Sequence, residues 1–352
     1  MKPEWKDFLL QAGAEFDGER VMHFGNPERE NSVVVTGDIL CDLSHHGLIS
    51  AHGEDAEAFL QGQLSLDVTD ISESISHLGS YCTPKGRMLA VFRMFRRGEA
   101  LYMRLPRETV EATLKRLSMF ILRAKVTLED ADDALVRLGL SGPNARAELK
   151  TALGIDPPEA TDNVVRHDSY SIICIPGLHD RFEIYGDLEP MTQLWQKLNV
   201  RCAPVGAPYW GLLDIMAGIP QIYPQTAEAF VPQMANMELL GGVNFNKGCY
   251  PGQEVVARSH YLGKLKRRMY RLALPIDDAP EPNTPLFDAK NDPDQPAGFI
   301  VEAQPHPDGG LQALAVLKIA SAESGDLHLG SAEGPAASVM SLPYSLEAAK
   351  AG

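Results

Sequence analysis

The sequence contains no long apolar run. A helix that crosses a membrane needs about 18 consecutive apolar residues, and the candidate at Ser171–Leu178 is interrupted by Pro176 and Gly177. The first residues, Met1-Lys2-Pro3, lack the apolar stretch of a secretion signal. We therefore expect a globular, cytoplasmic protein whose 352 residues form more than one domain.

Cysteine is also scarce. The five cysteines, at positions 41, 82, 174, 202 and 249, are odd in number, widely spaced and contain no C-x-x-C pair. This pattern argues against a disulfide framework and is typical of reduced thiols. Cys41 with His45, His46 and His52 matches no standard zinc spacing, and adjacent histidines on a strand point apart. We expect no metal site.

Basic residues are fewer than acidic ones. Lysine and arginine total 32 against 47 aspartates and glutamates, which gives a net charge of −15. Such a chain cannot bind nucleic acid through its overall field, because neutralising phosphates requires a basic surface. The one dense basic run holds Lys264, Lys266, Arg267 and Arg268. Two interpretations stay open: a local nucleic-acid contact, or a solvated strand edge where lysine blocks unwanted pairing.

Nucleotide-binding glycine motifs are missing as well. No G-x-x-x-x-G-K-[ST] occurs, because Gly263-Lys264 is followed by Leu265. No G-x-G-x-x-G follows an expected strand, so dinucleotide binding has no support. Ser259 and His260 lack an obvious orienting acid, and we do not expect a hydrolase-type pair.

The patterns that are present favour an α+β fold. Residues 87–95 and 100–105 are expected to be two strands joined by a turn at Arg96-Arg97-Gly98-Glu99. Pro106 opens a helix that runs to about Ser118, and a further strand is expected at 120–128. Hairpins mixed with single helices favour α+β over a doubly wound α/β fold.

Further units follow along the chain. Between 130 and 204 the pattern of strand, helix, two strands and helix is typical of a small ferredoxin-like module. Pro204–Pro208 has the composition of a linker, and a helix is expected at 209–217. The irregular stretch 218–242 is long enough to indicate a functional segment or one that lies over a site. Short strands between proline-rich turns then predict a terminal β-barrel, with strands at 267–274, 297–302 and 312–319.

One stretch concentrates reactive side chains: Lys247-Gly248-Cys249-Tyr250-Pro251-Gly252-Gln253-Glu254. Its two glycines and its proline specify a tight backbone, and Gln253 to His260 is expected to be a short helix. Cys249 would then lie just before a helix N-terminus and close to Lys247, and both would favour a reactive thiolate. The alternative, a turn whose cysteine is a small buried hydrophobe, stays open.

This octet resembles the motif of the YgfZ family. Members of that family are folate-binding relatives of the glycine-cleavage T-protein, linked to tRNA modification and to iron–sulfur enzyme maintenance. Other stretches are similar to the same family: Phe59-Leu60-Gln61-Gly62-Gln63 with Asp67-Val68, Tyr81 to Met88, Phe230-Val231-Pro232-Gln233 with Gly241-Gly242, and Leu342 to Glu347. The resemblance covers most of the chain.

The resemblance implies a ring of three domains around a folate pocket. It places a split α+β domain at 28–129 and 205–262, a ferredoxin-like insert at 130–204 and a β-barrel at 263–347. It implies a monomeric cytoplasmic protein that binds tetrahydrofolate or a derivative. The protein would support iron–sulfur enzymes or their assembly factors, including enzymes that methylthiolate tRNA, and any direct tRNA contact would use the basic run at 264–268.

The resemblance also implies roles for single residues. Cys249 would be the working thiol, and Lys247 would supply charge to folate's carboxylates or to a passing anion. The expected contacts to folate are Trp210, His46, Tyr250, Gln253 and Glu254. His46 stands where the family has a second pocket tryptophan, and an imidazole can still stack on a folate ring.

Two departures concern catalysis. T-proteins carry an aspartate that assists attack by a folate nitrogen, and the matching stretch here holds Ala90 and Val91 with no carboxylate. A T-protein glutamate aligns with Met216. General acid–base help worth roughly 10²–10⁴ in rate would be missing, so whether the chain is an enzyme stays open. The alternatives are a true folate-dependent aminomethyltransferase and a redox-sensing adaptor that works through Cys249.

Overall fold

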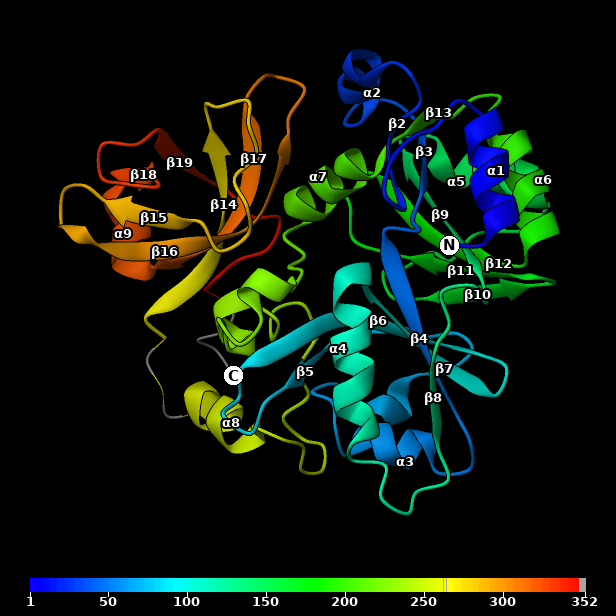
Figure 1. Cartoon of the computed structure of the whole chain (residues 1–352), viewed down its shortest axis with the longest axis horizontal. Coiled ribbons are helices and arrows are strands. Elements are labelled where there is room, and N and C mark those ends of the chain that lie inside the picture. The colour runs from blue at the N-terminus through cyan, green and yellow to red at the C-terminus, as the bar shows by residue number, and fades with distance from the viewer. Residues whose placement is uncertain (262, 264, 348–352) are drawn as a thin grey trace.

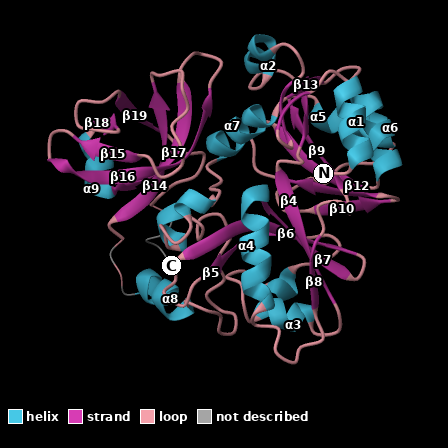
Figure 2. Cartoon of the chain, viewed as in Figure 1, coloured by secondary structure: helices cyan, strands magenta, loops and turns pink. Residues whose placement is uncertain are grey.

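The computed structural model describes residues 1–261, 263 and 265–347. Figure 1 shows a closed barrel on the left and two further sheets on the right, with helix α7 (Ala207–Ala217) between the barrel and the upper sheet. Figure 2 shows that each of these bodies is built on strands, with a few helices packed beside them. The expected α+β class is confirmed.

One body is an antiparallel five-stranded sheet. Its strand order is β5 (His77–Cys82), β6 (Met88–Arg97), β7 (Ala100–Pro106), β4 (His46–His52) and β8 (Thr127–Asp130). β6 and β7 form the hairpin that the sequence predicts. Helices α3 (Ala56–Gln61) and α4 (Arg107–Ser118) pack on this sheet, because Leu60, Val110 and Leu117 are buried in one cluster with residues of the strands.

The strand expected at 120–128 is largely wrong. Phe120 and Leu122 are 44% and 88% exposed, and β8 begins only at Thr127. Because α4 ends at Ser118, the chain crosses the surface here to reach an edge of the sheet. Its apolar side chains have no sheet face to cover.

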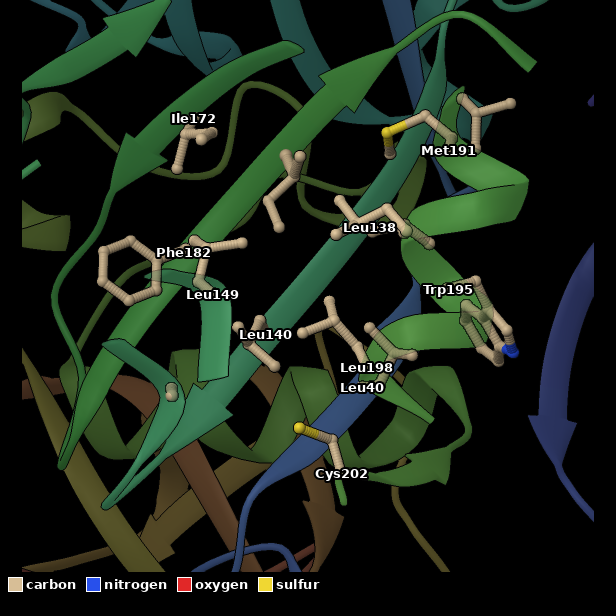
Figure 3. Close-up of a cluster of buried hydrophobic side chains, with 14 of the residues drawn as sticks. Leu40, Leu138, Leu140, Leu149, Ile172, Phe182, Met191, Trp195, Leu198 and Cys202 are labelled. Atoms are coloured by element: carbon tan, nitrogen blue, oxygen red, sulfur yellow. The ribbon is translucent and has the colours of Figure 1, made fainter. Parts of the chain in front are cut away.

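A second body is a six-stranded sheet. Its order is β10 (Val164–His167), β11 (Tyr170–Cys174), β12 (Asp180–Gly186), β9 (Val136–Gly142), β3 (Ile39–Asp42) and β13 (Ala203–Val205). Helices α1 (Pro3–Gln11), α5 (Ala145–Leu153) and α6 (Leu188–Leu198) share one hydrophobic cluster with it. In Figure 3, Leu138 and Leu140 of β9 lie beside Leu149 of α5 and Trp195 of α6.

Two segments of this sheet differ from the sequence-based expectation. Pro204 and Val205, expected to belong to a linker at 204–208, lie in β13 (Ala203–Val205). This strand pairs in parallel with β3, which in turn pairs with β9. Pro204 is tolerated because β13 is an edge strand, where a missing N–H can face away from the sheet. The domain boundaries stay a prediction, but this pairing places Ile39–Asp42 in the sheet of the insert.

The third body is the closed barrel, which confirms the expected terminal β-barrel. Its strand order is β14 (Arg267–Leu274), β17 (Leu311–Lys318), β16 (Asp292–Pro305), β15 (Pro285–Asp288), β18 (Leu327–Leu329) and β19 (Ala336–Met340), with α9 (Ile319–Ser324) beside it. The register between β16 and β17 shifts between Ile300 and Glu302. Ile300 and Ala303 both point into the barrel core, so Val301 and Glu302 together lie outside it.

Helix α7 joins these bodies. It is buried on almost every side, contacts β16 and β17 of the barrel, and also contacts β3 and the N-terminal strand β2 (Arg20–His23). Gly211 permits the close approach to the barrel, because a Cβ there would lie 2.8 Å from Glu302 Oε1. α7 therefore fixes the barrel against the six-stranded sheet.

The remaining elements lie around this frame. They are β1 (Glu15–Asp17), α2 (Pro27–Val33), short 3₁₀ turns at Val68–Asp70, Pro224–Thr226 and Pro232–Ala235, and α8 (Gln253–Tyr261). Residues 218–242 lack longer elements, as expected from the sequence. Among the described helices, none has both the length and the apolar character that crossing a bilayer requires.

Candidate functional site

Two neighbouring cavities lie beside α7, where it meets the barrel and β2. The inner chamber has a volume of about 30 Å³ and the outer chamber about 420 Å³. Both are lined by Arg20, Glu108, Tyr223 and Glu302, which therefore stand at their junction. The inner chamber is also lined by His45, His46, Gly211, Asp214 and Gln221.

The walls of the inner chamber come from distant parts of the chain. Arg20 lies on β2, His46 on β4, Asp214 on α7 and Glu302 on β16. The five-stranded sheet and the barrel thus contribute side chains to one cavity, together with α7 and the N-terminal strand β2. The cavity exists only when these bodies are assembled around α7.

The titratable groups of the inner chamber are strongly affected by burial. Burial raises the pKa of Glu302 to about 7, and the nearby carboxylate of Asp214 acts in the same direction. Burial also holds the pKa of His45 and of His46 well below the usual range, with neighbouring arginines adding to the effect. Both imidazoles are therefore neutral at pH 7, and Glu302 is close to half-protonated.

Several buried polar atoms of this chamber have no hydrogen-bond partner among the described residues. They include both ring nitrogens of His46, Oε1 of Gln221 and Oε2 of Glu302. The three residues are only 4%, 2% and 6% exposed, respectively. Because an unsatisfied buried polar group costs roughly 1–3 kcal/mol, such a cluster calls for water or a ligand.

Trp210 does not line either chamber. Its side chain is fully buried, with 0% exposure, and a Cβ added to Gly139 of β9 would lie 2.5 Å from its ring. The guanidinium of Arg181 stacks 4.0 Å from the ring centroid and pairs with Asp214 at 2.8 Å. Trp210 therefore supports α7 from the side of the sheet, while Gly211 and Asp214 face the cavity.

Lys247 of the octet is turned inward. Its Nζ donates to the backbone carbonyls of Leu64, at 2.8 Å, and Leu66, at 2.5 Å, and the residue is only 9% exposed. Burial lowers its pKa to about 8, against the raising effect of Asp67. Lys247 thus fastens the octet to the segment that follows α3.

Gly252 fixes the octet at a second point. Its φ is +85°, and a Cβ there would lie 2.4 Å from the Thr83 carbonyl oxygen and 2.7 Å from Gly86. No other residue fits this position without strain. The octet and the stretch around Tyr81 to Met88, which resemble the same family, are therefore in direct contact.

Cys249 is the exposed cysteine of this chain, whereas Cys41, Cys82, Cys174 and Cys202 are buried. The alternative of a buried Cys249 is therefore wrong, and the reactivity of this thiol stays a prediction. The expected helix follows it as α8, which begins at Gln253 as expected and ends at Tyr261.

The remaining octet side chains have separate environments. The Gln253 side chain donates to the Lys247 carbonyl at 3.3 Å, and Glu254 is exposed. Tyr250 is buried with its ring centroid 5.5 Å from Lys247 Nζ, and burial raises the pKa of its hydroxyl. That hydroxyl has no partner among the described residues.

The expected site residues therefore form two groups. Lys247, Cys249, Tyr250 and Gln253 share one turn, but no octet residue lines the central chambers, where His46 is the expected residue that is present. The contacts of these residues with folate stay a prediction. Sequence reasoning missed the cavity residues Arg20, Gln221, Tyr223 and Glu302; the length of the irregular segment 218–242 was a usable signal for Gln221 and Tyr223 only.

The basic run is also divided by the structure. Lys264 lies outside the described residues, Lys266 is exposed and Arg267 is half-buried. Arg268 is buried and forms an ion pair with Glu238 at 2.5 Å. Arg268 therefore cannot contact a nucleic acid in this fold, which corrects the expectation for that residue. No group of three or more metal-ligating side chains is found in the described part of the chain.

Comparisons with known proteins match these findings. The model of the GCVT N-terminal domain matches residues 10–216. The chain is 33% identical over 310 residues to the tRNA-modifying protein YgfZ of Colwellia psychrerythraea, which covers 87% of this chain and 93% of that protein. It is 34% identical to the tRNA-modifying protein YgfZ of Cronobacter sakazakii, over 88% of this chain and 94% of the relative.

A solved structure shows the same fold. The glycine cleavage system aminomethyltransferase T of Bartonella henselae superposes with a TM-score of 0.78 over 97% of each chain, at 19% sequence identity. At that identity the likeness concerns the fold alone. From the match of the family model and the identity to curated relatives over nearly their whole length, we conclude that this chain belongs to the YgfZ family.

Proposed function

We propose that this protein binds a reduced folate in the central chambers and supports tRNA modification in the cytoplasm, by assisting iron–sulfur enzymes. The folate part rests on one observation, a cavity lined by buried polar groups without partners. The tRNA part rests on the relatives, which are named tRNA-modifying proteins. The free thiols at all five cysteines fit a reducing compartment.

The side chains of the outer chamber fit a folate. Its volume of about 420 Å³ lies in the range of small-molecule pockets. The walls are largely apolar and suit the aminobenzoyl ring, with Met22, Pro208, Pro224, Pro280 and Pro282 among the lining residues. Arg20 offers a positive charge for a carboxylate, and Glu302 and Tyr223 offer polar contacts at the inner end.

The octet then has a different task from the folate pocket. Cys249 is exposed on a turn that Lys247 and Gly252 hold in place. We assign to Cys249 the reaction or contact with a partner, and to Lys247 the positioning of the turn. Tyr250 and Gln253 would support this turn through their contacts with Lys247, and contacts of Tyr250, Gln253 and Glu254 with folate stay a prediction.

Aminomethyl transfer is not the function that we propose. Ala90 and Val91, which stand where T-proteins have an acid, are buried in the five-stranded sheet at 0% and 1% exposure. The second candidate function is a redox-sensing adaptor, which the exposure of Cys249 alone among the five cysteines favours. A partner that binds equally well with or without folate, but only to reduced Cys249, would support it.

A local contact with RNA would use a revised set of cations. Lys85, Lys266 and Arg87 form no ion pair in the described part of the chain, and Arg87 lies close enough to Arg267 to lower the pKa of that guanidinium, after the larger effect of burial. Clustered unpaired cations in an acidic protein favour a polyanionic partner. Apart from such partners, we propose a monomer.

Calorimetry with tetrahydrofolate tests the folate part. We expect micromolar affinity, on the order of 8 kcal/mol, and absence of heat with any reduced folate would refute it.

For the tRNA part, Cys249→Ser should fold normally but fail to restore methylthiolated tRNA in cells that lack the protein. The matched control is Cys202→Ser, which changes a cysteine outside both sites; full restoration by Cys249→Ser would exclude a role for the thiol.

A further inference from the structure

The unpartnered oxygens at the inner end of the cavity are all acceptors. Glu302 Oε2 and Gln221 Oε1 are buried and receive no hydrogen bond of normal geometry in the described part of the chain. The Tyr223 hydroxyl is nevertheless close enough to Glu302 to favour the ionised carboxylate. The other carboxylate oxygen, Glu302 Oε1, accepts from Gln304 Nε2 at 3.1 Å and retains a second lone pair. This end of the cavity therefore requires a partner that supplies N–H or O–H donors.

Two features of the fold direct the Glu302 side chain toward α7 and the cavity. The register shift in β16 puts Val301 and Glu302 outside the barrel core together, as β-bulges commonly re-aim a side chain. Gly211 of α7 then leaves room for Glu302 Oε1, which lies within 2.8 Å of the position that a Cβ would occupy. Burying a carboxylate in this way is costly unless a ligand interacts with it.

We propose that Glu302 anchors a heterocyclic edge with two adjacent N–H donors, the 2-amino-4-oxopyrimidine edge that pterins and guanine share. A carboxylate accepts two parallel N–H bonds in a geometry that few other groups match. Glu302 lines the outer chamber as well, which has room for the ring. Gln221 lines only the inner chamber of about 30 Å³, which holds one or two water molecules, so Gln221 would accept from the ring through water. The inference rests on the proposed folate function, and it names the residue that would hold the ring.

The charges around Glu302 make such binding depend on protons. The groups that face it are Asp214 on α7, Arg20 on β2, Tyr223, Gln304, Glu108 at the junction, and the neutral His45 and His46, which precede and begin β4. Asp214 is already paired with Arg181. The N–H donors of a ligand bind the ionised carboxylate best, so binding releases a proton when Glu302 is protonated beforehand. Affinity should thus rise from pH 6 to pH 8.

Calorimetry on the full chain tests the proposal through the variant Glu302→Gln, which keeps the shape but replaces one acceptor by a donor. The first probe is tetrahydrofolate. The second is pterin, compared with lumazine, which has an oxo group in place of the 2-amino group. The third is guanosine, compared with inosine, which lacks the 2-amino group. We expect a roughly 10- to 100-fold loss of tetrahydrofolate affinity. Pterin should bind better than lumazine. The control Glu333→Gln removes an exposed charge from the same barrel and should bind as the unchanged protein does.

A second readout separates this role from a merely structural one. Titrations in buffers of different ionisation enthalpy should show proton release below pH 7 for the unchanged protein and none for Glu302→Gln. If Glu302→Gln binds tetrahydrofolate with unchanged affinity and proton release, or if lumazine binds as well as pterin, the proposal is wrong. If guanosine binds better than inosine while no folate binds, the proposed folate function fails and the assignment of Glu302 stands.

Discussion

The octet turn and the central cavity are built in opposite ways. The octet is one short stretch, fastened at Lys247 to Leu64 and Leu66 and at Gly252 to Thr83. The cavity takes one or two side chains each from β2, β4, α7, the irregular segment and β16. A local turn leaves a continuous signature in the sequence, whereas an assembled cavity leaves single residues that have no shared spacing.

The two regions also differ in what faces outward. The octet buries its cation and its phenol and exposes its thiol, so its outward chemistry is that of Cys249. The cavity buries carboxylate, amide and imidazole atoms without partners. The first arrangement suits contact with a macromolecule, and the second suits a small polar ligand.

Thiol reactivity should show the largest difference. At pH 7 Cys249 should alkylate at least on the order of 100-fold faster than Cys174, because a buried thiol reacts only after local opening. Burial also raises the pKa of Cys174 and brings that of Cys82 and of Cys202 to about 12. Site-resolved mass spectrometry after timed labelling measures this. Equal alkylation rates for Cys249 and Cys174 would contradict the conclusion that the octet exposes a reactive thiol.

Two glycines of the octet should respond differently to alanine. Gly252→Ala places a Cβ against the Thr83 carbonyl at a positive φ and should lower the free energy of unfolding by about 2–4 kcal/mol. Gly248→Ala meets nothing within 4 Å and should change it by less than about 0.5 kcal/mol. Urea unfolding of both variants gives the answer, and a similar cost for both would show that the turn is not held at Gly252.

Lys247→Met tests the other attachment of the octet. It leaves the Leu64 and Leu66 carbonyls without the donors they now have, so unfolding should become easier by about 1–3 kcal/mol. Lys266→Met, at an exposed site, is the control and should be close to neutral. Should Lys247→Met be equally stable, the lysine would be free to act as a charge, as the family resemblance implies.

The smallest effect is expected for the thermal stability of the ligand-free protein when Glu302 in the cavity is replaced. The pKa of Glu302 is raised to about 7 in the folded state, whereas an unfolded glutamate titrates near 4.3, so the folded protein loses stability as pH rises from about 4.3 to about 7. Glu302→Gln should therefore raise the melting temperature by roughly 2–4 °C at pH 8 and leave it nearly unchanged at pH 5. Calorimetric scans at both pH values test this, and a gain at pH 5 as large as at pH 8 would contradict the raised pKa.

The sequence predicts well what depends on neighbouring residues. The hairpin of β6 and β7, helices α6 and α7 and strand β14 follow from periodicity and turn residues. The inward turn of Lys247 could not be predicted, because its acceptors lie 183 and 181 residues away. The position of Glu302 at the cavity could not be predicted either. The register shift in β16 breaks the alternation of inward and outward side chains on which strand predictions depend.

The register shift in β16 lets the ligand recognised by the cavity change independently of the sequence motif that marks the family. Removing Glu302 would leave Val301 alone between Ile300 and Ala303, which restores regular alternation and takes the carboxylate out of the cavity. The octet, the barrel closure and helix α7 would keep their sequences. A lineage can thus exchange what its cavity recognises through a change of one residue in strand length, while the signature by which its members are identified stays intact.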